Sequence, residues 1–180
     1  MTVKGSVNSI ETLGLVDGPG VRVVVFLNGC KLRCKYCHNP EMQEMGKVNY
    51  TPEELVKKIR EYKPYYGGEG GVTFSGGEPL LQGEFLIAVS KLLREENIHI
   101  ALDTAGVGAG RYEEILENID LVLLDIKHIE RAGYRELTGA EMDEAEKFIK
   151  VMNKMEKKVW IRQVIVPRLN DSREYVEKLG

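Results

Sequence analysis

The residues best suited to chemistry are three cysteines that lie close together on one short stretch of the chain. Cys30, Cys34 and Cys37 are the only cysteines among the 180 residues, and their spacing is Cys-x3-Cys-x2-Cys. Three thiolates from one loop suit a cubane iron-sulfur cluster in which one iron has no protein ligand. Because a cluster that only transfers electrons normally has four cysteine ligands, the missing ligand indicates that a substrate or cofactor binds at the metal.

Two other roles for these cysteines fit the sequence less well. Zinc would need His38 as its fourth ligand, but Cys37 and His38 are neighbours and would need unusual backbone geometry to bind one ion. A disulfide framework is disfavoured because the number of cysteines is odd and the chain is long enough to form a core without disulfide bonds. A scaffold that binds zinc or a cluster without catalysis is the non-enzyme alternative.

The cysteine loop follows an apolar, β-branched run that predicts a buried strand at 21–27. Further strands are predicted at 3–10, 71–75, 98–103, 121–126 and 159–166, and helices at 52–62, 84–95, 111–118, 142–155 and 172–179. The alternation of strands and helices favours right-handed βαβ units and a parallel sheet. Five or six strands are too few for the closed eight-stranded barrel, so we expect a partial, open parallel (β/α) barrel, whose open side suits a macromolecular substrate.

Polar residues follow the predicted strands. The groups are Asn28-Gly29-Cys30, Ser75-Gly76-Gly77-Glu78, Asp103-Thr104 and Asp125-Ile126-Lys127. Because ligands of parallel α/β folds lie beyond the carboxyl ends of the strands, these groups should line one site. Arg162 lies in an apolar strand and is expected to pair with a carboxylate there. His99 and His128 belong to no motif and are expected to be structural or solvated.

The sequence resembles the radical S-adenosylmethionine (SAM) superfamily, whose signature is this cysteine spacing with an aromatic residue, here Tyr36, before the last cysteine. VDGPGVR at 16–22 and YCHNP at 36–40 look like the glycyl-radical-enzyme activating enzymes, most closely those that act on pyruvate formate-lyase. The resemblance extends over nearly all of the chain through GGEP at Gly76, LDT at Leu102, LDIK at Leu124 and VWIR at Val159. Pro79 and Ala105 differ from the residues frequent in that subgroup, so activation of ribonucleotide reductase or another radical SAM reaction is the alternative within the superfamily.

The resemblance implies a 4Fe-4S cluster on the three cysteines and SAM at the open iron. Reductive cleavage of SAM would give a 5′-deoxyadenosyl radical, which takes a hydrogen atom from a glycine of a partner of the formate C-acetyltransferase type. Flavodoxin or ferredoxin would supply the electron. The implied cofactor contacts are Tyr36, His38, Asn39, Gly76, Gly77, Asp103, Thr104, Asp125, Ile126, Lys127 and Arg162. Asp17, which could also simply start its turn, would contact the glycyl loop of the partner, and a monovalent cation would lie by Asp103, Thr104 and Asp125.

Length and charge set the remaining expectations. The chain should form one domain over residues 1–180. Its net charge of -3, from 25 basic and 28 acidic residues, gives no footprint for nucleic acid or an anionic membrane. No apolar run approaches the ~20 residues that cross a bilayer, and the N-terminus carries no secretory signal pattern. Free cysteines committed to a cluster fit the cytoplasm. The resemblance further implies a sixth βα unit beyond Gly180, with a histidine that contacts SAM, so the chain is expected to be a truncated or naturally short form.

Overall fold

The fold is built on one six-stranded sheet, with strands in the order β1-β2-β3-β4-β5-β6. It is seen in a computed structural model, which describes residues 3–179. The strands are β1 (Val7–Gly14), β2 (Arg22–Leu27), β3 (Gly71–Gly76), β4 (His99–Thr104), β5 (Leu121–Asp125) and β6 (Val159–Arg162). The helices are α1 (Pro52–Glu61), α2 (Gly83–Glu95), α3 (Tyr112–Glu117), α4 (Arg131–Thr138), α5 (Asp143–Lys154) and α6 (Arg173–Leu179), with 3-10 turns η1 (Pro40–Met42), η2 (Lys63–Tyr65) and η3 (Pro79–Gln82).

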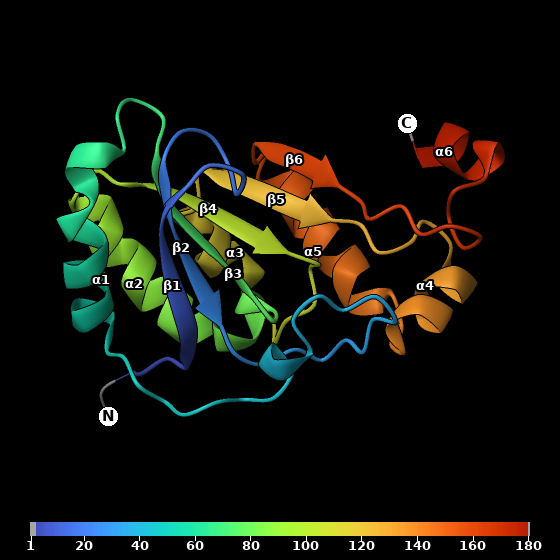
Figure 1. The fold of residues 1–180 in the computed structure, drawn as a ribbon, viewed down its shortest axis with the longest axis horizontal. Helices are drawn as coiled ribbons and strands as arrows, with labels where there is room; N and C mark the ends of the chain where they lie inside the picture. Colours follow the sequence, from blue (N-terminus) through green and yellow to red (C-terminus); the bar gives the residue numbers. More distant parts are fainter. Residues whose placement is uncertain (1–2, 180) are drawn as a thin grey trace.

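The strands from β2 to β6 are parallel, as the alternating pattern predicted. Their arrowheads point toward the same end of the molecule, where the cysteine loop and α4 lie (Figure 1). Six strands in sequence order, without closure between the described β1 and β6, form the partial, open barrel expected from the strand count. The carboxyl ends of five strands therefore meet at one edge.

The first strand differs from the prediction in place and direction. β1 spans Val7–Gly14, later than the predicted 3–10, and runs antiparallel to β2 with Val7 opposite Leu27. A connection as short as 15–21 can join antiparallel strands but cannot cross back to a parallel neighbour. Gly5, inside the predicted strand, instead forms an isolated bridge with Tyr50. The sheet is consequently mixed at this edge.

The main core lies between the sheet and the helices α1, α2, α3 and α5. Alternate strand residues such as Val25, Phe74 and Leu102 are fully buried against helix residues such as Leu86 and Phe148. This packing explains why the strand sequences are nearly continuous apolar runs: strands of a parallel sheet are buried on both faces. No helix among the residues 3–179 is long and apolar enough to cross a membrane.

The inner face of the sheet, turned away from this core, is more polar. It holds the small cluster of Ala101, Leu121 and Leu123 and two buried polar residues, Arg22 and Thr73. The open side of the barrel exposes this face where the strands end. It is the surface on which a site can form.

One helix, α4, was not predicted. It follows β5 and carries Gly133 in its interior, where glycine is a poor helix former. A Cβ on Gly133 would lie 2.1 Å from the His128 ring, so the glycine is needed for this packing. A contact between neighbouring segments, rather than local preference, therefore selects the residue.

Candidate functional site: a cysteine-lined cavity at the strand ends

A cavity of about 790 Å³ lies at the carboxyl ends of the parallel strands. Its wall combines the cysteine loop with polar residues at the carboxyl ends of β3, β4 and β5, as predicted. It is lined by Asp17, Phe26, Cys30, Leu32, Cys34, Tyr36, Cys37, His38, Asn39, Gln43, Ser75, Gly76, Gly77, Asp103, Thr104, Ala105, Asp125, Lys127 and Val164. All three cysteines and most of the predicted cofactor residues thus surround one space.

The cysteine loop, residues 30–37, is held by its backbone. The N–H groups of Arg33 and Lys35 donate hydrogen bonds to the carbonyl oxygens of Thr138 and Leu137 in the last turn of α4, at 2.7 and 2.9 Å. These carbonyls have no partner within their own helix, because the end of a helix leaves its last acceptors free. The unpredicted helix α4 is therefore the element that fixes the loop.

The three thiols themselves are free and half-buried. Burial raises the pKa of Cys30 to about 11 and also raises the pKa of Cys34. Without a bound cation the thiols of Cys30 and Cys34 stay protonated at neutral pH, whereas a metal deprotonates a coordinating thiol. The chemistry of this donor set is that of a metal-sulfur ligand loop.

A single metal ion is a poor fit for the loop. Among the described residues no three His, Cys, Asp or Glu side chains converge closely enough to hold one ion. A zinc site needs such convergence, while in a cubane each cysteine binds a different iron. The spacing Cys-x3-Cys-x2-Cys remains the feature that favours a cluster.

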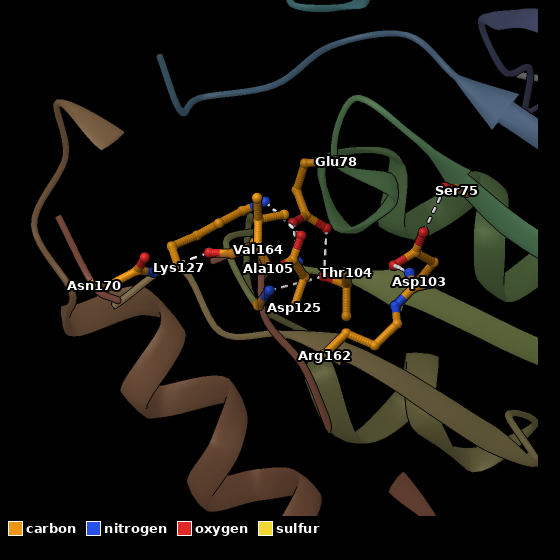
Figure 2. Close-up of polar contacts among 11 residues, drawn as sticks. Ser75, Glu78, Asp103, Thr104, Ala105, Asp125, Lys127, Arg162, Val164 and Asn170 are labelled. Carbon is orange, nitrogen blue, oxygen red and sulfur yellow. Dashed lines mark hydrogen bonds and ion pairs between the residues drawn. The ribbon is translucent and has the colours of Figure 1, made fainter. Parts of the chain in front are cut away.

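Two carboxylates lie at the carboxyl ends of β4 and β5, and each is paired with one cation (Figure 2). Asp103 accepts a hydrogen bond from Ser75 Oγ at 2.7 Å and forms an ion pair with Arg162, as predicted for that arginine. Asp125 Oδ2 lies 2.6 Å from Lys127 Nζ. The two acid-base pairs leave the cavity close to neutral, which limits the cost of burying them.

Two polar atoms beside the ion pair of Asp125 and Lys127 are free to bind a ligand. Asp125 Oδ1 and the Tyr36 hydroxyl are buried and have no hydrogen-bond partner within the described chain. Burial alone would lower the pKa of Lys127, but the Asp125 carboxylate outweighs it and raises that pKa, so the ammonium stays charged. Its Nζ also lies 5.6 Å from the centre of the Tyr36 ring. Unpaired buried polar atoms normally find a partner, and a polar ligand in this cavity would supply one.

The turn after β3 brings the backbone close to the cysteine loop. Gly76 has φ of 113°, a conformation that favours glycine. A Cβ on Gly77 would lie 2.4 Å from the carbonyl oxygen of Gly29. Both glycines are therefore fixed by backbone packing, and they leave the turn open toward the cavity that they line.

Glu78 was expected to line the site with Ser75, Gly76 and Gly77, but the structure places it beneath the lining, which the sequence did not predict. It is completely buried beneath the lining, and its carboxylate accepts hydrogen bonds from Thr104 Oγ1 at 2.5 Å, the Ala105 N–H at 2.9 Å and the Leu80 N–H at 3.1 Å (Figure 2). Burial raises the pKa of Glu78 to about 7, against the opposing effect of these donors. The carboxylate joins the turn after β3 to the end of β4. A glutamate after two glycines resembles a surface turn residue, so only the fold could show this.

Two predicted site residues lie elsewhere. The side chain of Ile126 packs against the main core instead of lining the cavity, because side chains on successive strand residues point to opposite faces. Arg162 reaches the site through its ion pair with Asp103 and is not part of the lining. His128, expected to be structural or solvated, is buried and packs on the ring of Tyr175 at 4.8 Å, while His99 contacts Arg22.

A comparison with protein families identifies the class that this fold and site define. The family model described as the radical SAM superfamily matches residues 24–179, so the chain belongs to this superfamily. That match includes the cysteine loop, the glycine turn and every strand from β3 to β6.

Relatives narrow the family further. The chain is 56% identical over 180 residues to a pyruvate formate-lyase-activating enzyme of Clostridium pasteurianum, covering 99% of this chain and 76% of that protein. It is 42% identical over 188 residues to the enzyme of the same name from Staphylococcus aureus strain USA300, covering 99% and 75%. Within the superfamily the chain groups with these activating enzymes. The predicted family and enzyme class are confirmed.

Solved structures agree with the fold. A domain of a pyruvate-formate lyase-activating enzyme from Bacteroides vulgatus matches with a TM-score of 0.55 at 28% identity, over 61% of this chain and 69% of that domain. The protein SuiB of Streptococcus suis, solved with its precursor peptide SuiA, matches with a TM-score of 0.66 over 87% of this chain and 35% of its own. At 21% identity the second likeness concerns the fold alone. The predicted fold class is confirmed.

Proposed function

We propose that the chain activates a glycyl-radical enzyme of the pyruvate formate-lyase kind, with Cys30, Cys34 and Cys37 as the ligands of a 4Fe-4S cluster. The observation that carries this proposal is the placement of all three free thiols in the wall of the cavity that also holds the paired carboxylates. The names of the two similar activating enzymes support the choice of partner.

The residues of the cavity fit both the 4Fe-4S cluster and SAM. Three thiols suit a cluster with one open iron, and the unpartnered Asp125 Oδ1 and Tyr36 hydroxyl suit a polar ligand beside it. When bound, the cluster supplies the electron and the open iron at which SAM is cleaved to the radical that takes hydrogen from glycine. The protein contributes the ligands, the orientation of the bound molecule and the exclusion of water.

Each remaining role follows from position. Gly76 and Gly77 present backbone to the bound cofactor, since their turn lines the cavity without side chains. Lys127 offers a fixed positive charge to a carboxylate of SAM while it orients Asp125. His38 and Asn39, next to the last cysteine, offer polar groups to the same cavity. Asp17 reaches the same cavity from the connection between β1 and β2, where it would meet the substrate glycine.

Arg162 and Ile126 are proposed to act on the cofactor indirectly, since neither side chain lines the cavity. Arg162 acts on the cofactor by holding Asp103, with which it forms an ion pair. Ile126 contributes through its backbone, whose N–H donates to the Arg162 carbonyl at 2.8 Å and joins the ends of β5 and β6.

A monovalent cation is proposed beside Asp103, Thr104 and Asp125. The free Asp125 Oδ1 supports it, whereas Lys127 and Arg162 already supply two positive charges there. Comparing SAM cleavage in potassium and tetramethylammonium buffers tests this part, because the methyl groups of tetramethylammonium keep carboxylate and hydroxyl oxygens from coordinating its charge. Equal rates in both would remove the cation from the proposal.

The wider setting is also proposed. One domain over residues 1–180 is supported by a single sheet that joins every described strand. Free thiols that must stay reduced support a cytoplasmic location, and a cytoplasmic flavodoxin or ferredoxin is the proposed electron donor.

Anaerobic reconstitution with iron and sulfide tests the function directly. With SAM and a reductant the protein should release 5′-deoxyadenosine, and with added pyruvate formate-lyase it should give the doublet signal of a glycyl radical. Cys34→Ala should abolish both products, while Lys35→Ala, which changes an exposed side chain of the same loop, should keep both. The function is refuted if the reconstituted protein makes no more 5′-deoxyadenosine than Cys34→Ala.

A further inference from the structure

Arg22 is a fully buried arginine on the inner face of the sheet. It forms no ion pair with a carboxylate anywhere in residues 3–179, which is unusual because buried charges are normally paired. Its donors go instead to Thr73 Oγ1 (2.6 Å), the carbonyl oxygens of Val72 (2.6 Å), Pro19 (2.9 Å), Glu69 (3.4 Å) and His99 (3.4 Å), and the His99 ring (3.2 Å). Arg22 thus joins the connection after β1 to the beginnings of β3 and β4.

Thr73 connects Arg22 to Asp17, which lines the cavity. Its hydroxyl accepts from Arg22 Nε and donates to the carbonyl oxygen of Asp17, both at 2.6 Å. A hydroxyl has one proton to donate, so this pair of bonds fixes its orientation. Thr73 lies two residues before Ser75 on the same face of β3, and Ser75 binds Asp103 in the cavity.

The segment that carries Asp17 also packs closely against Arg22 and Gly70. Gly18 has φ of 126°, and a Cβ there would lie 3.0 Å from Arg22 Cδ. A Cβ on Gly20 would lie 2.5 Å from the backbone nitrogen of Gly70. Two glycines therefore let the segment press against Arg22 and the neighbouring loop, so that residues 17–20 have one defined path over the inner face.

We infer that Arg22 and Thr73 are positioning residues that hold Asp17 in the cavity, and that they act on binding of the glycine segment of the partner enzyme but not on SAM. This inference rests on the proposed function. The reason for the separation is spatial: Thr73 and Arg22 contact the Asp17 segment and line no part of the cavity. Leu15 and Val16, just before Asp17, are largely exposed (71% and 83%), which leaves this side open to a macromolecule.

Thr73→Val is the sharpest test, since it removes the bridging hydroxyl and keeps the size of the side chain. In the cluster-loaded protein we expect the KM for pyruvate formate-lyase to rise by between about twofold and tenfold, the effect of one hydrogen bond. Formation of 5′-deoxyadenosine without the partner should not change. Thr73→Ser should restore the KM, and Ser90→Ala, which removes a buried hydroxyl without a partner on α2, should leave all values as in the parent protein.

Hydrogen exchange of residues 14–21 gives a second readout that needs no catalysis. Thr73→Val should speed exchange there and Thr73→Ser should not. If Thr73→Val does not fold, Gly18→Ala disturbs the same segment from outside the sheet and should raise the KM in the same way. An unchanged KM together with unchanged exchange overturns the inference, as does a parallel loss of SAM cleavage without the partner. If the parent protein cleaves no SAM, the proposed function fails and the exchange data alone decide the role of Thr73.

Discussion

Replacing Glu78 by glutamine should remove a pH dependence from the stability of the protein. The buried carboxyl has a pKa of about 7 against an ordinary value of 4.5, so between these values the folded protein keeps a proton that the unfolded chain releases. The free energy of unfolding therefore falls as the pH rises through this interval and stays low above about pH 7. Glutamine cannot ionise, so its contribution does not change with pH.

The size of the effect follows from the pKa. A displacement from 4.5 to about 7 corresponds to about 3 kcal/mol of unfolding free energy. Glutamine also places an amide NH₂ where a carboxylate oxygen accepted from Thr104 or Ala105, which costs about 1–3 kcal/mol at any pH. Glu78→Gln should thus be less stable than the parent at low pH, and the difference should shift by about 3 kcal/mol in its favour at high pH.

Urea unfolding of the reduced, cluster-free protein, followed by circular dichroism at about pH 5 and about pH 8, measures this shift. Glu95→Gln makes the same change at an exposed position of α2 and should follow the parent protein at both pH values. If Glu78→Gln loses as much stability between the two pH values as the parent does, Glu78 is not the group that titrates.

Three further predictions concern single side chains. Thr51→Ala should lower the free energy of unfolding by about 1 kcal/mol in urea, because Thr51 Oγ1 accepts from the Glu54 N–H at 3.3 Å and caps α1; an unchanged midpoint would show that the cap is dispensable. Phe74→Ala should lower the free energy of unfolding by about 3–5 kcal/mol in the same measurement, since Phe74 is fully buried in the main core. A loss below that range would mean that neighbouring side chains fill the space that the phenyl ring leaves. Lys127→Met should raise the dissociation constant for SAM at least about tenfold by equilibrium dialysis with unchanged iron content, because it removes the cation paired with Asp125. Unaltered binding of SAM would exclude Lys127 from the cofactor site.

Much of the architecture was predictable because local patterns and tertiary packing agree. The capping box of Thr51 and Glu54 begins α1 where predicted, and the β-branched run at 21–27 became the buried strand β2. The rule that parallel strands present their carboxyl ends at one edge correctly brought Ser75, Asp103 and Asp125 together. The spacing of the motifs and the order of the strands were enough to predict that these residues meet, so no tertiary contact had to be known.

Other features depend on contacts that no local pattern records. Residues of β1 are mostly exposed, so alternation could not fix the start of the strand. The interior glycine of α4 lowers the helix propensity of that segment, and its reason, the packing of His128 against it, is a tertiary contact. Glu78 carries no sign of burial in its neighbours, and Ile126 faces the core because of strand alternation that the motif LDIK hides.

The hydrogen bonds from Arg33 and Lys35 to the end of α4 have a consequence for the free energy of loading a cluster. Since these bonds use no metal, the loop keeps its shape when iron is stripped from it. A loop that already has this conformation would lose less conformational entropy on binding a cluster than a disordered loop would.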